Sequence, residues 1–153
     1  AAGEPVIENR KARHNYMIEE TLECGIELRG TEVKSVRQGQ MSLAEGWVRA
    51  EVAPPGLTLH GVHISEYSPA SSAHQHDPDR ARRLLAHKRE IVNLATAVRS
   101  RNATIVPLKV YFVRGRAKLL VGIGVGKRKA DKREDLAKKD ARRDMDRAMS
   151  RRR

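Results

Sequence analysis

The sequence predicts an antiparallel α+β or barrel architecture that is mainly β. Five or six segments alternate between apolar and polar residues, two or three others have helical periodicity, and strands and helices do not alternate regularly along the chain. The chain has 153 residues, which suits one domain with an appendage. That length can bury a core without help from disulfides or metal.

The longest predicted strand covers residues 16–28. Its even-numbered residues are mostly apolar and would face the core, with Glu20 as the exception, whereas Glu23 would face solvent. Two further strands are expected near 46–53 and 57–64, separated by a turn at 54–56 that contains two prolines and a glycine.

A hairpin forms the last two predicted strands. Arg114-Gly115 lies at its tip, because glycine readily adopts a positive φ. Pro107 indicates an edge or a bulge, since proline cannot donate to the strand ladder. The inward-facing residues would be Val106, Leu108, Val110 and Phe112 on one strand and Ala117, Leu119, Val121, Ile123 and Val125 on the other.

Helices are predicted in two places. Thr31 would cap a short helix over 32–38 that ends at Gly39. After a loop at 65–78, Asp77-Pro78 would open one long helix or two short ones that meet near Lys88. Its apolar stripe comprises Ala81, Leu84, Leu85, Ile91, Val92, Ala95 and Val98, and its other face carries Arg80, Arg82, Arg83 and Arg89.

The net charge of +12, from 31 basic and 19 acidic residues, favours a polyanionic partner. Nucleic acid is the first candidate and an anionic membrane the second. Aromatic residues are only 3% of the chain, which argues against stacking of many unpaired bases and favours contacts to phosphates and to shape. Residues 126–153 carry 13 of the basic residues against 6 acidic ones. We expect this tail to be disordered when free and helical when bound.

Nothing in the sequence announces catalysis, a metal or a cofactor. The segment 122–127 resembles a phosphate-binding loop, but Val121 and Arg128 stand where glycine and Ser/Thr are required, so glycines that let a strand bend are the better interpretation. The pair His74 and His76 has no second ligand cluster. Cys24 lies on the inward parity of its strand and is expected in the core.

The same sequence favours a cytoplasmic location. One cysteine cannot form an intrachain disulfide, and no apolar run approaches the roughly 18 residues of a membrane-spanning helix. Residues 1–9 lack the pattern of a signal peptide.

Several stretches, in order along nearly the whole chain, resemble the small protein B family, the bacterial partners of transfer-messenger RNA (tmRNA). The most specific are Gly-Thr-Glu-Val-Lys-Ser at 30–35 and the late Gly-Lys-Arg and Asp-Lys-Arg motifs within 126–133. The matching segments are Asn9–Tyr16, Glu23–Arg37, Arg82–Ile91, Val106–Leu108 and Gly126–Arg133.

The resemblance implies a closed, OB-like barrel over 1–125 with two or three flanking helices, and a flexible basic tail over 126–153. It implies ribosome rescue by trans-translation, with no enzymatic activity. The barrel would hold the tRNA-like domain of tmRNA, and the tail would occupy the empty mRNA channel of the small subunit near the decoding centre. Further implied partners are alanyl-charged tmRNA and elongation factor Tu. The protein would act as a monomer and would not bind a membrane.

The resemblance also assigns residues. Asn9, Glu23, Leu85 and His87 are similar to family positions that contact RNA, and Lys118, Lys127 and Arg128 resemble further backbone contacts. Asp131, Lys132 and Arg133 match the tail segment needed on the ribosome. Charge adds Arg10, Lys11, Arg82 and Arg83 as phosphate contacts. The sequence departs from the family at Asn15, where an acid is common, and in the distal tail, which has no aromatic residue.

The sequence allows two roles for Glu23, and it allows two functions for the chain other than tmRNA binding. Glu23 would either accept hydrogen bonds from base amino groups or 2′-hydroxyls, or buttress a neighbouring arginine. A general RNA chaperone would bind by charge alone. A hydrolase acting on RNA would need a poised acid–base pair, and none is visible.

Overall fold

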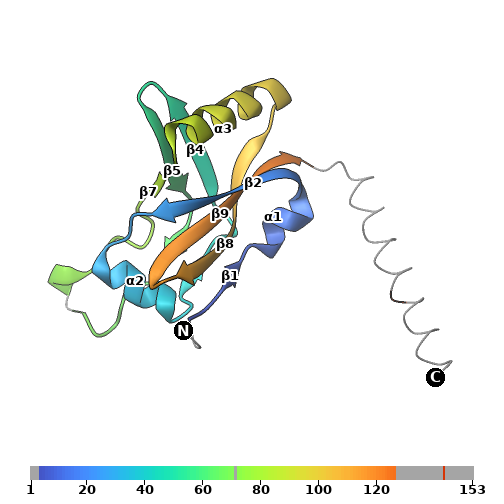
Figure 1. Cartoon of the computed structure of the whole chain (residues 1–153). Coiled ribbons are helices and arrows are strands. Elements are labelled where there is room, and N and C mark those ends of the chain that lie inside the picture. Colours follow the sequence, from blue (N-terminus) through green and yellow to red (C-terminus); the bar gives the residue numbers. More distant parts are fainter. Residues whose placement is uncertain (1–3, 71, 127–142, 144–153) are drawn as a thin grey trace.

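The computed structural model describes residues 4–70, 72–126 and 143. They form an α+β fold built on a mostly antiparallel sheet (Figure 1). The strands are β1 (Ile7–Glu8), β2 (Tyr16–Ile26), β3 (Met41–Ser42), β4 (Trp47–Val52), β5 (Pro55–His60), β6 (His63–Ile64), β7 (Arg82–Leu85), β8 (Thr104–Val113) and β9 (Arg116–Gly126). The helices are α1 (Arg10–Asn15), α2 (Gly30–Arg37), α3 (Lys88–Arg101) and a 3-10 turn at Ser72–His74.

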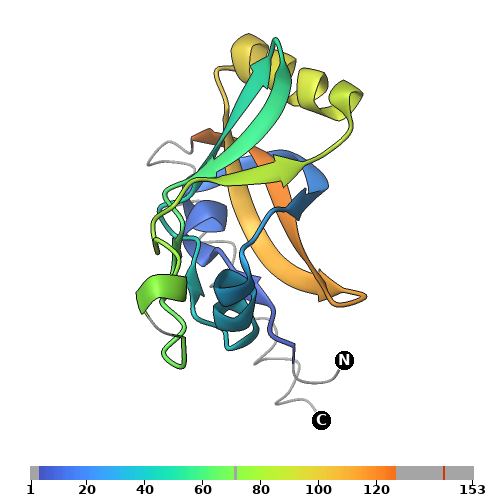
Figure 2. The same cartoon turned by 90° about the vertical axis from the view of Figure 1, so that its left-hand side faces the viewer.

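Seven strands form one sheet in the order β1-β8-β4-β5-β7-β2-β9, and β9 also pairs with β8. All of these pairings are antiparallel, and the path from β8 through β4, β5, β7, β2 and β9 returns to β8. The β4–β8 link is narrow, because only Val48 and Ile105 pair there. Helices α3 and α2 lie at opposite ends of the sheet (Figures 1 and 2).

The main core lies between the sheet's inner face and α3. Leu57, Leu59, Leu119, Val121 and Ile123 are fully buried in it. A second, smaller cluster lies on the other face of β2, β8 and β9, beneath α1, and contains Ala12, Val106 and Leu108 with Tyr16, Ile18 and Leu120 packed against them.

Strands β2 and β8 each contain a register irregularity, and this explains why each strand contributes apolar residues to both clusters. The irregularities lie between Ile18 and Glu20 on β2 and between Pro107 and Lys109 on β8. A bulge adds one residue and so reverses which parity faces which side. The prediction that the even residues of 16–28 share one face is therefore wrong, and so is the same prediction for 106–112. The sequence indicates an edge or a bulge at Pro107, and the register irregularity there corresponds to the bulge.

The glycines near the end of β9 make room for the second cluster. A Cβ on Gly122 would lie 2.8 Å from both Ile18 Cγ2 and Leu108 Cδ1, and one on Gly124 would lie 2.9 Å from Tyr16 Cβ. Both glycines belong to a strand. The expectation that they let this strand bend stays a prediction.

The long helix predicted from residue 77 is wrong in its first part. Residues 82–85 form β7, which pairs with β5 and β2, and α3 begins only at Lys88. Burial alternates along β7, so Leu84 is buried and Leu85 is exposed. At the junction, the backbone N–H of His87 donates to Glu90 Oε1 at 3.1 Å.

The other short helix is shifted from its predicted start. α2 begins at Gly30, and the Arg29 N–H donates to Glu32 Oε1 at 2.7 Å, so Thr31 is not its cap. Its predicted stop is confirmed, since Gly39 has a φ of 75°. In the described part of the chain, no helix has the length and apolarity to cross a membrane.

Candidate nucleic-acid interface

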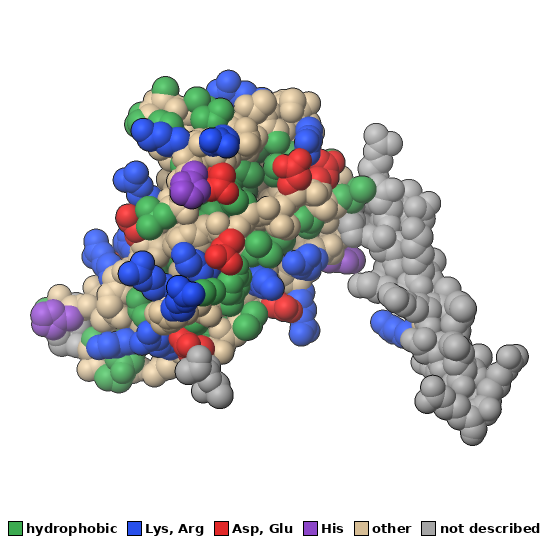
Figure 3. Space-filling view, in the orientation of Figure 1, with side chains coloured by type: hydrophobic (Ala, Val, Ile, Leu, Met, Phe, Trp, Pro, Cys, Tyr) green, Lys and Arg blue, Asp and Glu red, His purple; other side chains and the backbone are tan. Residues whose placement is uncertain are grey.

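Three neighbouring strands build the floor of the candidate interface. Lys118 on β9 pairs with Gly25 on β2 and with Tyr111 on β8, and in the next row Leu120 pairs with Glu23 and Lys109. Paired residues of antiparallel strands point to the same side of a sheet. We call this outer side of β2, β9 and β8 the β2–β9–β8 face. Figure 3 shows Lys and Arg side chains scattered over it among hydrophobic ones.

The end of β7 and the start of α3 form the adjacent wall. Gly25 pairs with Leu85, and a Cβ on Gly25 would lie only 3.2 Å from the Leu85 Cβ, so the glycine lets β7 approach closely. Leu85 remains 49% exposed. An open depression results, lined by Glu23, Gly25, Leu85, Ala86, His87, Glu90 and Lys118.

A second depression continues from the first toward the tip of the β8–β9 hairpin. It shares Gly25, Leu85 and Lys118 with the first and adds Arg116 and the apolar side chains of Ile26, Leu28, Val33 and Ala117. Within the described residues, neither Lys118 nor Arg116 makes an ion pair. The two cations are therefore available to phosphates beside an apolar surface.

The Glu23 carboxylate is held by a tyrosine from across the sheet. The Tyr111 hydroxyl donates a hydrogen bond to Glu23 Oε2. Burial, followed by this bond and the Glu23 charge, raises the pKa of Tyr111 to about 12. The Lys109 ammonium lies 5.3 Å from the centroid of the Tyr111 ring. Sequence analysis assigned no role to Tyr111 or Lys109, although their outward parity on the predicted hairpin was a usable signal.

Behind this face, Cys24 belongs to the core, as predicted. Burial, then the charges of Glu90 and Glu23, raises the pKa of its thiol to about 12. Burial and the raised pKa both disfavour the thiolate at neutral pH, which fits a core residue.

Four of the predicted RNA contacts thus come together from three separate segments: Glu23, Leu85, His87 and Lys118 all line the first depression. Arg83 is exposed on β7, where it pairs with Thr58 on β5. Arg10 and Lys11 are exposed on α1, and Lys11 forms a surface ion pair with Glu45. Lys11 lines a different depression, together with Asn15 and Trp47.

Asn9 is buried rather than presented to a partner. Only 3% of it is exposed. Its Nδ2 donates to the carbonyl oxygens of Leu43 at 3.0 Å and Pro107 at 2.8 Å, and its Oδ1 accepts from the Ala12 N–H at 3.1 Å. Asn9 therefore caps α1 and ties it to two distant segments.

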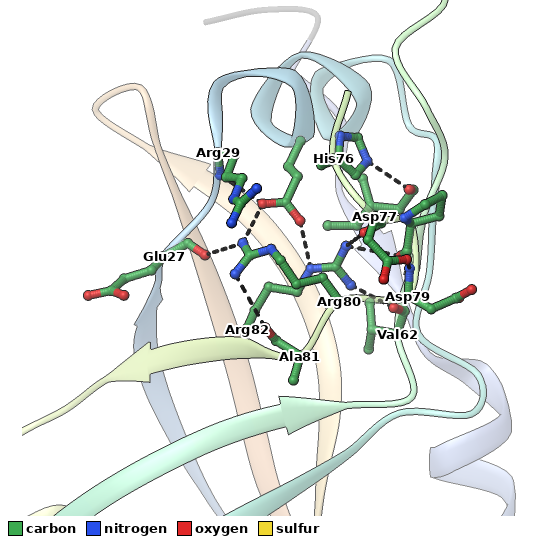
Figure 4. A network of polar contacts seen from close by, with 12 residues as sticks. Glu27, Arg29, Val62, His76, Asp77, Asp79, Arg80, Ala81 and Arg82 are labelled. Carbon is green, nitrogen blue, oxygen red and sulfur yellow. Dashed lines mark hydrogen bonds and ion pairs between the residues drawn. The ribbon is translucent and has the colours of Figure 1, made fainter. Parts of the chain in front are cut away.

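Arg82 is also buried, with none of its side chain exposed. Its Nε donates to Glu32 Oε2 at 2.7 Å, and its Nη1 donates to the Val62 carbonyl at 2.7 Å (Figure 4). Its predicted position on a solvent-facing helix is wrong, because β7 turns this residue inward. Arg82 thus holds α2, β7 and the loop after β5 together, and it is not part of an exposed surface.

Glu32 is the shared acceptor of this buried network. Burial alone would raise its pKa, but hydrogen bonds from Arg80, the Arg29 backbone and Arg82 hold the pKa below its usual value. Nearby, His76 Nε2 lies 2.9 Å from the Ile64 carbonyl oxygen, and Nδ1 lies 2.8 Å from Thr31 Oγ1. Among the described residues no three His, Cys, Asp or Glu side chains gather as metal ligands.

The predicted tail contacts lie outside the described residues. They are Lys127, Arg128, Asp131, Lys132 and Arg133.

Comparison with known proteins gives consistent matches over most of the chain. The pattern of the family described as "SmpB protein" matches residues 6–151. An "SsrA-binding protein" of Chloroflexus aurantiacus (strain ATCC 29366 / DSM 635 / J-10-fl) is 50% identical over 146 residues, covering 95% of this chain and 90% of that protein. One of Exiguobacterium sp. (strain ATCC BAA-1283 / AT1b) is 51% identical over 142 residues, covering 93% and 89%.

A solved structure is also similar, from work described as "tmRNA-SmpB: a journey to the center of the bacterial ribosome". It superposes with a TM-score of 0.67 at 45% sequence identity, covering 86% of this chain and 94% of that one.

Proposed function

This chain belongs to the SmpB protein family, and from that membership we propose that it binds tmRNA and acts with it on the ribosome in trans-translation. Relatives are named for binding SsrA, and a similar chain has been solved in a tmRNA–SmpB study of the bacterial ribosome. One observation supports a particular surface as the RNA-binding site: Glu23, Leu85, His87 and Lys118 line the same depression.

The chemistry of that depression suits a folded, tRNA-like RNA. Lys118 and the nearby Arg116 attract phosphates, while the exposed Leu85 offers apolar contact to a ribose or a base. Glu23 accepts hydrogen bonds from base amino groups or 2′-hydroxyls through its carboxylate, and His87 donates or accepts beside it. Because a carboxylate repels phosphates, its presence favours one RNA shape over polyanions in general. Arg10, Lys11 and Arg83 add exposed charge around this surface.

We infer that the protein is a non-catalytic adaptor in the cytoplasm, acting as a monomer. The depression holds two carboxylates beside an apolar side chain and Lys118, and both are engaged in hydrogen bonds: Glu23 accepts from the Tyr111 hydroxyl and Glu90 from the His87 N–H. This arrangement suits binding rather than acid–base catalysis. We also infer that the sheet acts as a closed, OB-like barrel, supported by the strand pairings that return to β8. A barrel has no free sheet edges and presents a rigid face to RNA.

The tail, residues 126–153, is the second part of the proposal. It carries 13 basic and 6 acidic residues, and this positive balance suits a path lined by ribosomal RNA. Lys127 and Arg128 extend the tmRNA contact, and Asp131, Lys132 and Arg133 act in the empty mRNA channel of the small subunit, where the tail becomes helical. Elongation factor Tu delivers the complex with alanyl-charged tmRNA.

Recovery of bound RNA tests the proposal. The full chain and a chain that ends at Gly126 are each expressed in bacteria, purified at moderate salt, and the RNA that copurifies is sequenced. Both chains are expected to enrich tmRNA, but only the full chain should support tagging of stalled products. Bulk RNA without enrichment of one tRNA-like species would contradict the proposed function, and normal tagging by the shortened chain would contradict the role of the tail.

A further inference from the structure

We propose that Tyr111 is a positioning residue of the RNA interface: its hydroxyl fixes the Glu23 carboxylate, so that the free oxygen of Glu23 accepts a hydrogen bond from RNA. The proposal rests on the function proposed above and adds a residue and a mechanism to it.

The first step is geometric. Tyr111 and Glu23 lie on β8 and β2, on either side of β9, and both point outward from the β2–β9–β8 face. The Tyr111 hydroxyl crosses β9 diagonally to donate to Glu23 Oε2. A glutamate on an exposed strand would otherwise sample several rotamers. The hydrogen bond therefore removes freedom that RNA binding would otherwise have to remove.

The second step concerns the two carboxylate oxygens. Tyr111 occupies Oε2, and within the part of the chain that the structure describes, no hydrogen bond reaches Oε1 of Glu23. A carboxylate can accept at both oxygens. The arrangement thus leaves one oriented acceptor beside Leu85, His87 and Lys118 in the depression.

The third step is electrostatic. A phenol is protonated at neutral pH and can donate to a carboxylate, and burial together with Glu23 raises the pKa of Tyr111 further, to about 12. The Lys109 ammonium, 5.3 Å from the ring centroid, adds a cation next to the pair. Tyr111 therefore offers its hydrogen to Glu23, and Lys109 adds positive charge to a surface that must also attract phosphates.

Direct contact between Tyr111 and RNA is the rival interpretation, and a double-mutant cycle separates the two. The full-length chain and its Tyr111→Phe, Glu23→Ala and doubly substituted variants are titrated with the tRNA-like domain of tmRNA at fixed salt. Loss of one hydrogen bond to a charged group corresponds to about a tenfold change in affinity. We expect Tyr111→Phe to weaken binding by about tenfold in the native background and to change nothing further in Glu23→Ala, where the acceptor is absent.

Three controls accompany the cycle. Tyr67→Phe removes a phenol hydroxyl elsewhere, where Lys34 contacts the ring, and should leave affinity unchanged. Glu23→Asp keeps the charge but shortens the reach to Tyr111, so it should lose affinity as Tyr111→Phe does. Thermal unfolding of each variant verifies that the folded chain is being titrated.

The outcomes are distinct. Additive losses would show that Tyr111 acts independently of Glu23 and would overturn the inference, as would native affinity in both Tyr111→Phe and Glu23→Asp. If Lys118→Ala weakens binding in the same assay while Tyr111→Phe does not, the inference fails and the proposed function stands. If the native chain does not prefer the tRNA-like domain to an unrelated duplex, the proposed function fails and the inference with it.

Discussion

At the scale of single residues, Glu32 and Arg82 form a buried ion pair near the interface. Both side chains are wholly buried, and Glu32 accepts from Arg82, Arg80 and the Arg29 backbone. A buried charge is tolerated only when its partners replace water, so the pair fixes how α2 meets β7. Leu85 lies at the end of the same strand as Arg82, and His87 follows two residues later, so their placement depends on that junction.

Replacing Glu32 by glutamine should destabilise the protein strongly. The Arg82 guanidinium would stay buried without its counter-charge, which typically lowers the free energy of unfolding by about 3–5 kcal/mol. The matched control is Glu45→Gln, which weakens the exposed ion pair with Lys11 and should lower it by at most about 1 kcal/mol. Urea unfolding of the two variants at neutral pH measures both values, and equal losses would refute a structural role for the buried pair.

The difference in unfolding free energy between the native chain and Glu32→Gln should depend on pH, because the pKa of Glu32 is lowered in the folded state. A depressed pKa contributes stability that is complete above the unfolded value, which is 4.5 for glutamate here, and that is lost as the pH falls through the folded value. The stability difference between the native chain and Glu32→Gln should therefore narrow as the pH is lowered below 4.5. If the stability difference between the two chains stays constant as the pH falls, ionised Glu32 is not the cause of the stabilisation.

Among the secondary-structure elements, β2, β8 and β9 each pack against the main core on one face and against the second cluster on the other. The bulges at Ile18–Glu20 and Pro107–Lys109 turn part of β2 and β8 toward α1 and the rest toward the main core. The glycines of β9 allow this, because Gly122 lies against Ile18 and Leu108. The elements that carry Glu23, Tyr111 and Lys118 thus gain packing on both faces.

Gly122→Ala should therefore disturb the second cluster. The added methyl group would sit 2.8 Å from two side chains, and such overpacking typically destabilises by about 1–3 kcal/mol. Gly126→Ala on the same strand is the control, since no atom lies within 4 Å of its added Cβ. Urea denaturation compares the two, and a Gly122→Ala chain as stable as Gly126→Ala would show that the close packing does not limit this position.

The elements also show how far sequence reasoning reaches. The strand at 16–28 and the closing hairpin were predicted in place, because alternation is a local property. The bulges were missed because alternation continues through them in the sequence while the faces exchange. The sequence around Arg82–Leu85 predicts a helix, since two polar residues followed by two apolar ones fit the period of a helix as well as that of a strand. Only its pairing with β2 and β5 decides it.

For the interface, exposure was predictable and burial was not. The strand pattern placed Glu23 outward, and its position in the depression with Leu85, His87 and Lys118 agrees with that. Asn9 and Arg82 are expected at the surface, but each is held in the interior by partners distant in the sequence. These are Leu43 and Pro107 for Asn9, and Glu32 and Val62 for Arg82. No local pattern announces such contacts.

At the scale of the whole molecule, a shaped surface and a general positive charge make different contributions to RNA binding. The net charge of +12 alone would bind any polyanion in a strongly salt-dependent way. The depression on the β2–β9–β8 face adds groups that charge does not explain, above all the uncharged and half-exposed Leu85. Selectivity for one RNA should depend on these groups, whereas overall affinity should depend on the cations.

The most direct test of this difference compares two dissociation constants at one salt concentration for the native chain and for Leu85→Ser. The ligands are the tRNA-like domain of tmRNA and an unrelated duplex of equal length. Because the substitution changes no charge, we predict a loss of about tenfold for the tRNA-like domain and no change for the duplex. Equal changes for both ligands, or none for either, would contradict the claim that this surface recognises one structured RNA.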